Sequence, residues 1–308
     1  MLRKLRILLF IGLVVGFFTS LSVSAAQRKP GLFYTQDKQD QLQLIQNPFS
    51  LQAAKRLNYY GGPVLGHAKI VVVFWGGDVN STTQSSIGGF IRAIVDSTYM
   101  DLFAQYDTNI NALDGRSGTQ QRIERGVFGG QFLIQPRNSK RDIDDSEIGI
   151  ELSQQIDAGV LPKPDADTVF LIYYPPNFSI TVDGSKSCEV FCGYHHNFTS
   201  QVYGDVYYSV IPDLEGACSY GCQFALTPFQ NLSVTTSHEI AEAITDPDVH
   251  LGGVAYPVAW ATANGEEIGD LCASDIANLF LADGSSYVVQ QEFDNSTRKC
   301  APGPFRSR

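Results

Sequence analysis

The sequence predicts an α/β (α+β) fold, in which helices flank a mixed central sheet and disulfides brace the C-terminal half. Two observations carry this prediction. Apolar runs typical of buried strands alternate with segments of helical periodicity through the first half of the 308-residue chain. All six cysteines lie in the second half. The alternation indicates helices packed on a sheet, and the cysteines indicate covalent bracing beside it.

Four segments are expected to form strands. The first and third are continuous apolar runs, which is typical of strands buried on both faces. Gly76 and Gly77 end the first run, and Pro175 and Pro176 end the third. The expected strands are residues 70–75, 127–134, 169–174 and 287–290.

Three segments have apolar residues at offsets of three and four, which predicts amphipathic helices. In the second of them Ile148, Leu152 and Ile156 form one stripe. Residues 181–230 lose this periodicity and are rich in Gly, Cys and aromatic residues, so we interpret them as a disulfide-braced insertion. The expected helices are residues 85–96, 143–158 and 233–245.

The N-terminus has the features of an export signal. A basic start with Arg3, Lys4 and Arg6 precedes an apolar run, and residues 23–25 form a small-residue cleavage site. We therefore expect a signal peptide over residues 1–25 and an extracellular, secreted protein. No later run approaches the ~20 apolar residues of a membrane span. Residues 26–58 are expected to be an N-terminal arm or a pro-segment, and residues 59–303 a single domain.

The composition limits the kinds of molecule that the protein can bind. A formal net charge of −10 argues against nucleic acid, which needs a basic surface. An even number of cysteines in an exported chain predicts disulfides, although six cysteines allow 15 pairings. We expect four of them to staple two loops and the last two to close the C-terminal segment; metal binding by the two C-x-x-x-C pairs is the alternative for a reducing compartment. The cysteines are Cys188, Cys192, Cys218, Cys222, Cys272 and Cys300.

Candidate glycosylation sites follow from Asn-x-Ser/Thr sequons without proline in the middle. In a eukaryotic host some of these asparagines are expected to carry glycans. The sequons start at Asn80, Asn177, Asn197, Asn231 and Asn295.

The segment 237–242, Ser-His-Glu-Ile-Ala-Glu, carries the chemistry. His238 and Glu242 are four residues apart, so a helix places both on one face, within reach of one ion. Glu239 lies about 100° around the helix and is free to act as a general base. Zinc accepts both ligand types and needs a third, for which Asp270 is the first candidate and Glu267 the second. The pattern is that of a zinc peptidase helix with Glu in place of the second His.

The helical wheel assigns an orientation to this segment. Ile240, Ala241, Ala243 and Ile244 fill the arc opposite His238. We therefore expect the apolar arc to pack on the body and the His238–Glu242 side to face outward or into a cleft.

Three alternatives compete with this interpretation. Thr236-x-x-Glu239 is also a capping box that would start a helix without any catalytic role. Four aspartates are candidates for a calcium site, because calcium takes oxygen ligands from flexible loops. Of the adjacent His195 and His196 at most one is expected to reach the site, since neighbours on a strand point apart. His67 and His250 are expected to be structural or solvated. The aspartates are Asp246, Asp248, Asp270 and Asp275.

Several of these segments together resemble the EXORDIUM-like, or phosphate-induced protein, family of secreted proteins best known from plants. The resemblance implies that the His-Glu-x-x-Glu helix and the Glu267–Asp270 segment converge on one place. It also implies an association with the cell wall. Tyr60 and Asp246 stand where the family usually has His and Asn, and Asp246 is a further candidate ligand. The similar segments are residues 59–64, 70–75, 188–195, 218–222, 237–247 and 267–272.

The sequence thus supports the hypothesis of an exported zinc-dependent peptidase or related hydrolase, with His238, Glu242 and Asp270 or Glu267 as metal ligands and Glu239 as general base. The alternative is a non-catalytic extracellular protein that binds a cell-wall or matrix component, with a structural metal or none.

Overall fold

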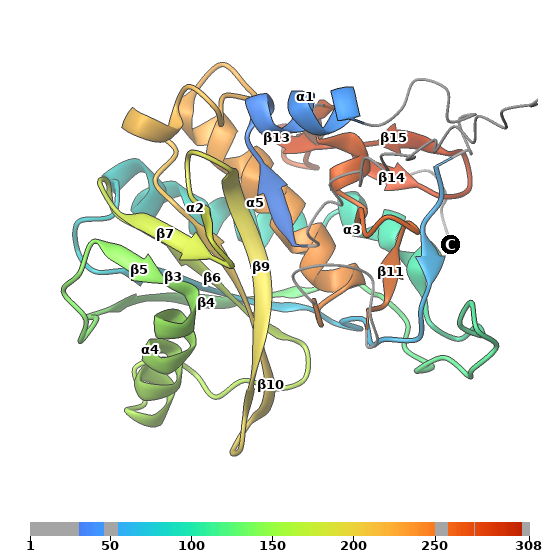
Figure 1. Ribbon diagram of the computed structural model, residues 1–308, viewed down its shortest axis with the longest axis horizontal. Helices are drawn as coiled ribbons and strands as arrows, with labels where there is room; N and C mark the ends of the chain where they lie inside the picture. The colour runs from blue at the N-terminus through green and yellow to red at the C-terminus, as the bar shows by residue number, and fades with distance from the viewer. Residues whose placement is uncertain (1–30, 46–54, 250–257, 274, 304–308) are drawn as a thin grey trace, which may run out of the picture.

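A computed structural model of the protein describes residues 31–45, 55–249, 258–273 and 275–303. Its centre is a six-stranded mixed sheet in the order β1-β9-β10-β6-β3-β4 (Figure 1). Strands β10, β6, β3 and β4 are parallel, whereas β9 is antiparallel to both of its neighbours. The strands are β1 (Leu32–Tyr34), β3 (Lys69–Trp75), β4 (Val127–Ile134), β6 (Thr168–Tyr173), β9 (Phe191–Ser200) and β10 (Gly204–Ile211).

Helices cover both faces of this sheet, and short strand pairs border it. The helices are α1 (Gln36–Ile45), α2 (Ser81–Val95), α3 (Thr98–Asp101), α4 (Asp145–Asp157) and α5 (Pro228–Thr245), with the 3-10 helices η1 (Leu102–Tyr106), η2 (Gly216–Cys218) and η3 (Asp270–Cys272). The smaller strands are β2 (Asn58–Tyr59), β5 (Asp142–Asp144), β7 (Ser179–Val182), β8 (Ser185–Lys186), β11 (Trp260–Ala261), β12 (Ile276–Phe280), β13 (Ser286–Gln290), β14 (Glu292–Asp294) and β15 (Lys299–Ala301).

The hydrophobic core has two parts, one on each face of the sheet. Along β3, Ile70, Val72 and Phe74 point into the part that packs against α2 and α5. Val71, Val73 and Trp75 point into the part that packs against α4. This alternation follows from the two-residue period of a strand and explains why the run is apolar throughout. The predicted α/β fold is confirmed.

One expectation about the chain's organisation is wrong. Residues 181–230 are not an insertion, because they contain β9 and β10, two long strands of the central sheet. The cause is that Gly, His and polar residues interrupt the apolar pattern of this segment. Within the expected N-terminal arm or pro-segment, β1 pairs with β9 and α1 follows it. The expected signal peptide, residues 1–25, lies outside the described residues.

Three disulfides brace the second half of the chain. Cys188–Cys218 and Cys192–Cys222 join the two C-x-x-x-C segments to each other, and Cys272–Cys300 closes the C-terminal segment as expected. Paired cysteines cannot serve as metal ligands, which removes the alternative of a cysteine metal site. Among the described helices, none is long and apolar enough to cross a membrane.

The sequons differ in exposure. Asn231 is buried, and its side-chain oxygen accepts hydrogen bonds from the backbone of Phe224 and Ala225, so it is unavailable for a glycan. Asn177 is exposed. The amides of Asn80, Asn197 and Asn295 are half-buried and donate hydrogen bonds to other residues.

Helix α5 starts earlier than predicted. Thr227 caps it in a capping box with Gln230, and Pro228 occupies the first turn. Thr236 therefore lies in the middle of an 18-residue helix, and the interpretation of Thr236 and Glu239 as a capping box is wrong. The helix is buried from Asn231 to Thr245, between the sheet on one side and β13 on the other.

Candidate metal centre

The His238–Glu242 side of α5 faces a closed polar interior. His238 Nε2 lies 3.1 Å from Glu242 Oε2, as expected for residues one helical turn apart. Both side chains have no exposed surface. The expectation that this side faces outward or into a cleft is wrong, because β9, η3 and β13 cover the face that the helical wheel left open.

Strand β9 contributes His195 to this interior. Its Nδ1 lies 3.5 Å from Glu242 Oε2 and 3.6 Å from Glu239 Oε2. Its Nε2 lies 3.4 Å from Glu267 Oε2 and 3.1 Å from the carbonyl oxygen of Asp246. The adjacent His196 stacks on Tyr208 instead. Only one member of the histidine pair reaches the centre, as strand geometry requires.

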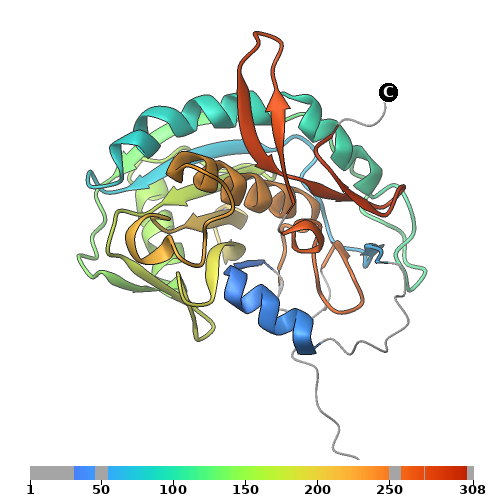
Figure 2. The ribbon, with the colours of Figure 1, turned by 90° about the horizontal axis from the view of Figure 1, so that it is seen from above.

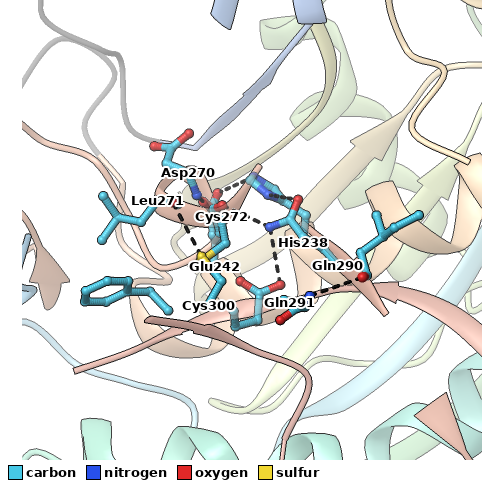
Figure 3. Close-up of a disulfide and its surroundings, with 12 residues drawn as sticks. His238, Glu242, Asp270, Leu271, Cys272, Gln290, Gln291 and Cys300 are labelled. Carbon is cyan, nitrogen blue, oxygen red and sulfur yellow. Dashed lines mark hydrogen bonds and ion pairs between the residues drawn. A yellow bond between two sulfur atoms is a disulfide. The ribbon is translucent and has the colours of Figure 1, made fainter. Parts of the chain in front are cut away.

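The segment before Cys272 approaches from another side. The backbone N–H of Asp270 donates to Glu242 Oε1 at 3.2 Å, and the N–H of Glu267 donates to Asp270 Oδ2 at 3.1 Å. Figure 3 shows His238 and Glu242 beside the Cys272–Cys300 disulfide, which fixes this segment. Both candidate third ligands, Asp270 and Glu267, thus lie near the helix.

These side chains form two groups that could each hold a metal ion. One is His238, Glu242 and Asp270, and the other is His195, Glu242 and Glu267. In each group the ligand atoms lie within 4.8 Å of one another. Glu242 belongs to both groups and is therefore the central residue of the site.

Several buried polar atoms of the centre have no hydrogen-bond partner within the described residues. Such atoms are rare in folded proteins, because leaving one unpaired costs about 1–3 kcal/mol. A cation held by either ligand group would satisfy the unpaired atoms of that group, since these are nitrogen and carboxylate oxygen atoms of the type that zinc binds. The atoms are His195 Nδ1, His238 Nε2, Glu239 Oε1 and Oε2, Glu242 Oε2, Asp246 Oδ2 and Glu267 Oε1 and Oε2.

The crowding of charges shifts the pKa of several groups in the centre. Burial raises the pKa of Glu239 to about 7 and that of Asp246 to about 8. Burial and the neighbouring Glu242 carboxylate raise the pKa of Glu267 well above its usual value. Burial acts against protonated His238, but Glu242 outweighs it and raises the pKa of His238 to about 10. Burial also opposes ionised Glu242, yet His238 and His195 hold its pKa below the usual range.

Gln290 on β13 orients His238. His238 Nδ1 lies 3.2 Å from Gln290 Oε1, while Gln290 Nε2 donates to the carbonyl oxygen of Gly269 at 2.9 Å. The amide therefore presents its oxygen to the imidazole, so Nδ1 donates to Gln290 and Nε2 faces Glu242. Metal-ligating histidines are oriented in this way by a second partner.

Two glycines permit the close approach of backbone to the centre. A Cβ atom at Gly269 would lie 2.4 Å from His238 Nδ1, and one at Gly193 would lie 2.6 Å from Glu239 Oε1. No other residue type fits at these positions without displacing a buried side chain. The backbone at Gly269 and Gly193 thus contacts His238 and Glu239 directly, with no side chain in between.

The other candidates lie apart from this centre. His67 is exposed, and His250 lies outside the described residues. None of the metal-compatible groups in the described chain contains two of the four aspartates proposed for calcium, so the geometry does not favour that alternative. A third group, Cys272, Asp275 and Cys300, is excluded because its cysteines form a disulfide.

Comparison with protein-family models, with curated proteins and with solved structures found no match. The site must therefore be interpreted from its own chemistry.

Sequence reasoning misses two parts of this centre. His195 is only one of two adjacent candidates, and nothing in the sequence chooses between them. Gln290 ends an expected strand, and a single glutamine carries no recognisable signal of a role. A Thr followed directly by Pro, with Gln three residues after the Thr, is a readable helix start and could have placed the beginning of α5 correctly.

Proposed function

We propose that this protein is a zinc-dependent hydrolase of the peptidase class, with His238, Glu242 and Asp270 as metal ligands. The observation that carries the proposal is the set of buried nitrogen and carboxylate atoms around Glu242 that lack hydrogen-bond partners. Glu267 and His195 form the second ligand group together with Glu242. The resemblance to the EXORDIUM-like family supports the convergence of these segments.

When bound, zinc supplies Lewis-acid polarisation of the substrate carbonyl and lowers the pKa of water. Glu239 supplies the proton transfer. Both of its carboxylate oxygens lack hydrogen bonds, and it lies next to the ligand-bearing turn without belonging to either ligand group. It takes a proton from the attacking water as the C–O bond forms and gives it to the amine as the C–N bond breaks. His195, 3.6 Å away, stabilises its ionised form.

A second function is favoured by one observation. His238, Glu239, Glu242 and Glu267 have no exposed surface, so a substrate cannot reach them in the described conformation. A buried ion is typical of structural sites, in which no position is left for substrate. The second candidate is therefore a non-catalytic extracellular protein whose metal stabilises the fold and whose surface binds a cell-wall or matrix component.

Two measurements separate these functions. Elemental analysis of the gently purified protein should find near-stoichiometric zinc, and its absence would end the hydrolase proposal. Glu239→Gln should then lower peptide hydrolysis at least ~100-fold, in the range expected for loss of a general base, with zinc content unchanged. If Glu239→Gln and the parent are equally inactive while both hold zinc, the structural function is supported.

Glu151→Gln is the matched control. Glu151 is a buried glutamate on α4, and both of its oxygens accept hydrogen bonds, from the backbone of Arg137 and from the side chain of Gln155. Its substitution should leave both zinc content and hydrolysis unchanged.

A further inference from the structure

An aromatic side chain from the N-terminal segment lies directly on the candidate metal centre. The ring of Phe33 stacks on the imidazole of His238, with centroids 4.0 Å apart and planes 22° apart. On its other side Phe33 stacks on Phe224 at 4.7 Å. Phe33 has no exposed surface. It therefore covers one face of the His238 imidazole.

Strand β1 holds Phe33 in this position along the edge of the sheet. Phe33 pairs with Gly193, the residue that passes over Glu239, and Leu32 pairs with Tyr194. The N–H of His195 donates to the carbonyl oxygen of Gly31 at 3.0 Å. β1 runs antiparallel to β9. An extended peptide bound at a sheet edge makes this type of contact, with backbone hydrogen bonds and one anchoring side chain.

Non-covalent contacts hold the described part of the segment that carries β1 against the rest of the protein. No cysteine precedes Cys188, so no disulfide ties the segment down. Helix α1 lies at the rim of the molecule (Figure 2), and its sequence is largely polar. The segment's other contacts include the pairing with β9, the buried side chains of Leu32, Tyr34 and Leu42, and hydrogen bonds such as that from Gln36 N–H to the carbonyl oxygen of Gly221 at 2.9 Å.

A protease-sensitive pair of residues ends this segment. Lys55 and Arg56 are adjacent and exposed, and paired basic residues are what dibasic-specific processing proteases recognise. Leu57, the next residue, is buried, and its N–H and carbonyl oxygen both bond to the side-chain amide of Asn295. The boundary between a removable segment and an anchored body thus falls at Arg56.

We propose that the chain up to Arg56 is an inhibitory pro-segment. Its strand β1 covers the metal centre until a dibasic-specific protease cleaves after Arg56. Hydrolysis of the Arg56–Leu57 peptide bond consumes one water and leaves a carboxylate on Arg56 and an amine on Leu57. The vacated edge of β9 then binds an extended peptide in the place of β1, with an apolar or aromatic side chain in the position of Phe33. The peptide substrate rests on the proposed hydrolase function, whereas the seal and its removal do not.

Cleavage acts by removing a tether rather than by breaking contacts. While the chain is intact, a short linker keeps β1 at an effective concentration of roughly millimolar beside β9. After cleavage β1 is a separate peptide that competes with substrate at its own concentration. A groove of about 470 Å³ on the other side of Phe224, lined in part by Ile276 and Val288, extends the surface available to a long peptide.

A second exposed Lys-Arg pair provides the control. Lys140 and Arg141 occupy a loop, but Lys140 forms an ion pair with Glu147, and Arg141 lies over the ring of Phe178. Cleavage there would not release β1. Lys140→Gln with Arg141→Gln is therefore the matched variant for Lys55→Gln with Arg56→Gln.

The test uses the full exported chain, zinc-loaded and treated with a protease specific for Lys-Arg pairs. We expect intact mass to show a new N-terminus at Leu57, and native gel filtration at submicromolar concentration to separate the released fragment. Zinc transfer to a chelator and hydrolysis of unstructured peptides should each rise at least ~10-fold. Lys55→Gln/Arg56→Gln should stay sealed, whereas Lys140→Gln/Arg141→Gln should open like the parent. A synthetic peptide of residues 27–45 should slow zinc transfer again.

Three results would overturn the proposal. They are failure to cut after Arg56, retention of the cut fragment through gel filtration, and an unchanged rate of zinc transfer after its release. Failure of the hydrolase function looks different. In that case the fragment leaves and the backbone amides of β9 exchange hydrogen faster, but no zinc is bound or no peptide is hydrolysed.

Discussion

Helices α4 and α5 cover opposite faces of the same sheet, and they differ in what they bury. Both begin with a capping box. Helix α4 buries one apolar stripe and leaves Ile150 exposed, and its buried Glu151 is fully hydrogen-bonded. Helix α5 is buried all round and keeps His238, Glu239 and Glu242 among atoms without partners. The buried carboxylate of α4 is satisfied by the protein itself, whereas the unpaired atoms of α5 are those that the proposed metal would bind.

The largest expected difference between the two helices comes from removing one glutamate from each. Glu242→Ala deletes the residue that both ligand groups share, so zinc content should fall below about a tenth of the parent's and hydrolysis at least ~100-fold. Glu151→Ala should keep its zinc and lower the free energy of unfolding by about 1–3 kcal/mol, because it leaves buried donors unpaired. Elemental analysis and urea unfolding measure both. Stoichiometric zinc in Glu242→Ala would contradict the assignment.

A smaller effect is expected from pH in the zinc-free protein. The folded-state pKa is raised for Glu239, to about 7, and for Asp246, to about 8, so the folded state holds these protons more tightly than the unfolded chain. The stabilisation is complete below about pH 4, near the pKa values of these carboxyl groups in the unfolded chain, and it is lost as pH rises toward 8. A tenfold difference in proton affinity between the two states corresponds to about 1.4 kcal/mol. The raised pKa of His238 acts in the same direction above pH 6.5.

Melting of the chelator-treated protein at pH 5 and pH 8 tests this directly. The melting temperature should be lower at pH 8, and added zinc should raise it more there, because the ion replaces the bound protons. Glu239→Gln should flatten the profile. A zinc-free protein that becomes more stable between pH 5 and pH 8 would contradict the raised pKa values of Glu239 and Asp246.

The smallest effect should be the same in both helices. Asp144→Ala in α4 and Thr227→Ala in α5 each remove a side chain that caps a helix, at a cost of about 1 kcal/mol. Neither should change zinc content, since both caps lie far along the chain from the ligands. Denaturant unfolding of the two variants checks whether the helices differ only in their buried polar residues. Loss of zinc from Thr227→Ala would reject that view.

The sequence predicts α4 and its stripe well and α5 only in part. Ile148, Leu152 and Ile156 lie in the core as their spacing predicts, because an amphipathic helix has one neighbour, the sheet. The helical wheel of α5 correctly places His238 and Glu242 on one side of the helix. It does not predict that other segments bury this side. The polar side of α5 is covered by His195, Asp270 and Gln290, whose segments are distant in sequence, so no local periodicity could reveal them.

Strands β9 and β10 show the same limit. Together their sequences mix Gly, His, Asn and Tyr, and β9 borders the polar centre. Neither strand therefore has the continuous apolar run by which a buried strand is predicted from sequence. The Cys188–Cys192 and Cys218–Cys222 segments are stapled as expected, but which cysteine joins which depends on the sheet between them. The Cys272–Cys300 pair could be predicted because it is the remaining pair once the other four are grouped.

The two crossed disulfides also determine when the site can assemble during biosynthesis. Cys192 lies three residues before His195, and Cys222 lies shortly before the start of α5, so their bond encloses β9 and β10 in one covalent loop. His195 and His238 therefore lie on two elements, β9 and α5, that the Cys192–Cys222 disulfide links. A cell that makes this chain in a reducing cytosol should yield a protein with the right strands but a loosely held histidine, and refolding protocols should add the oxidant before the metal.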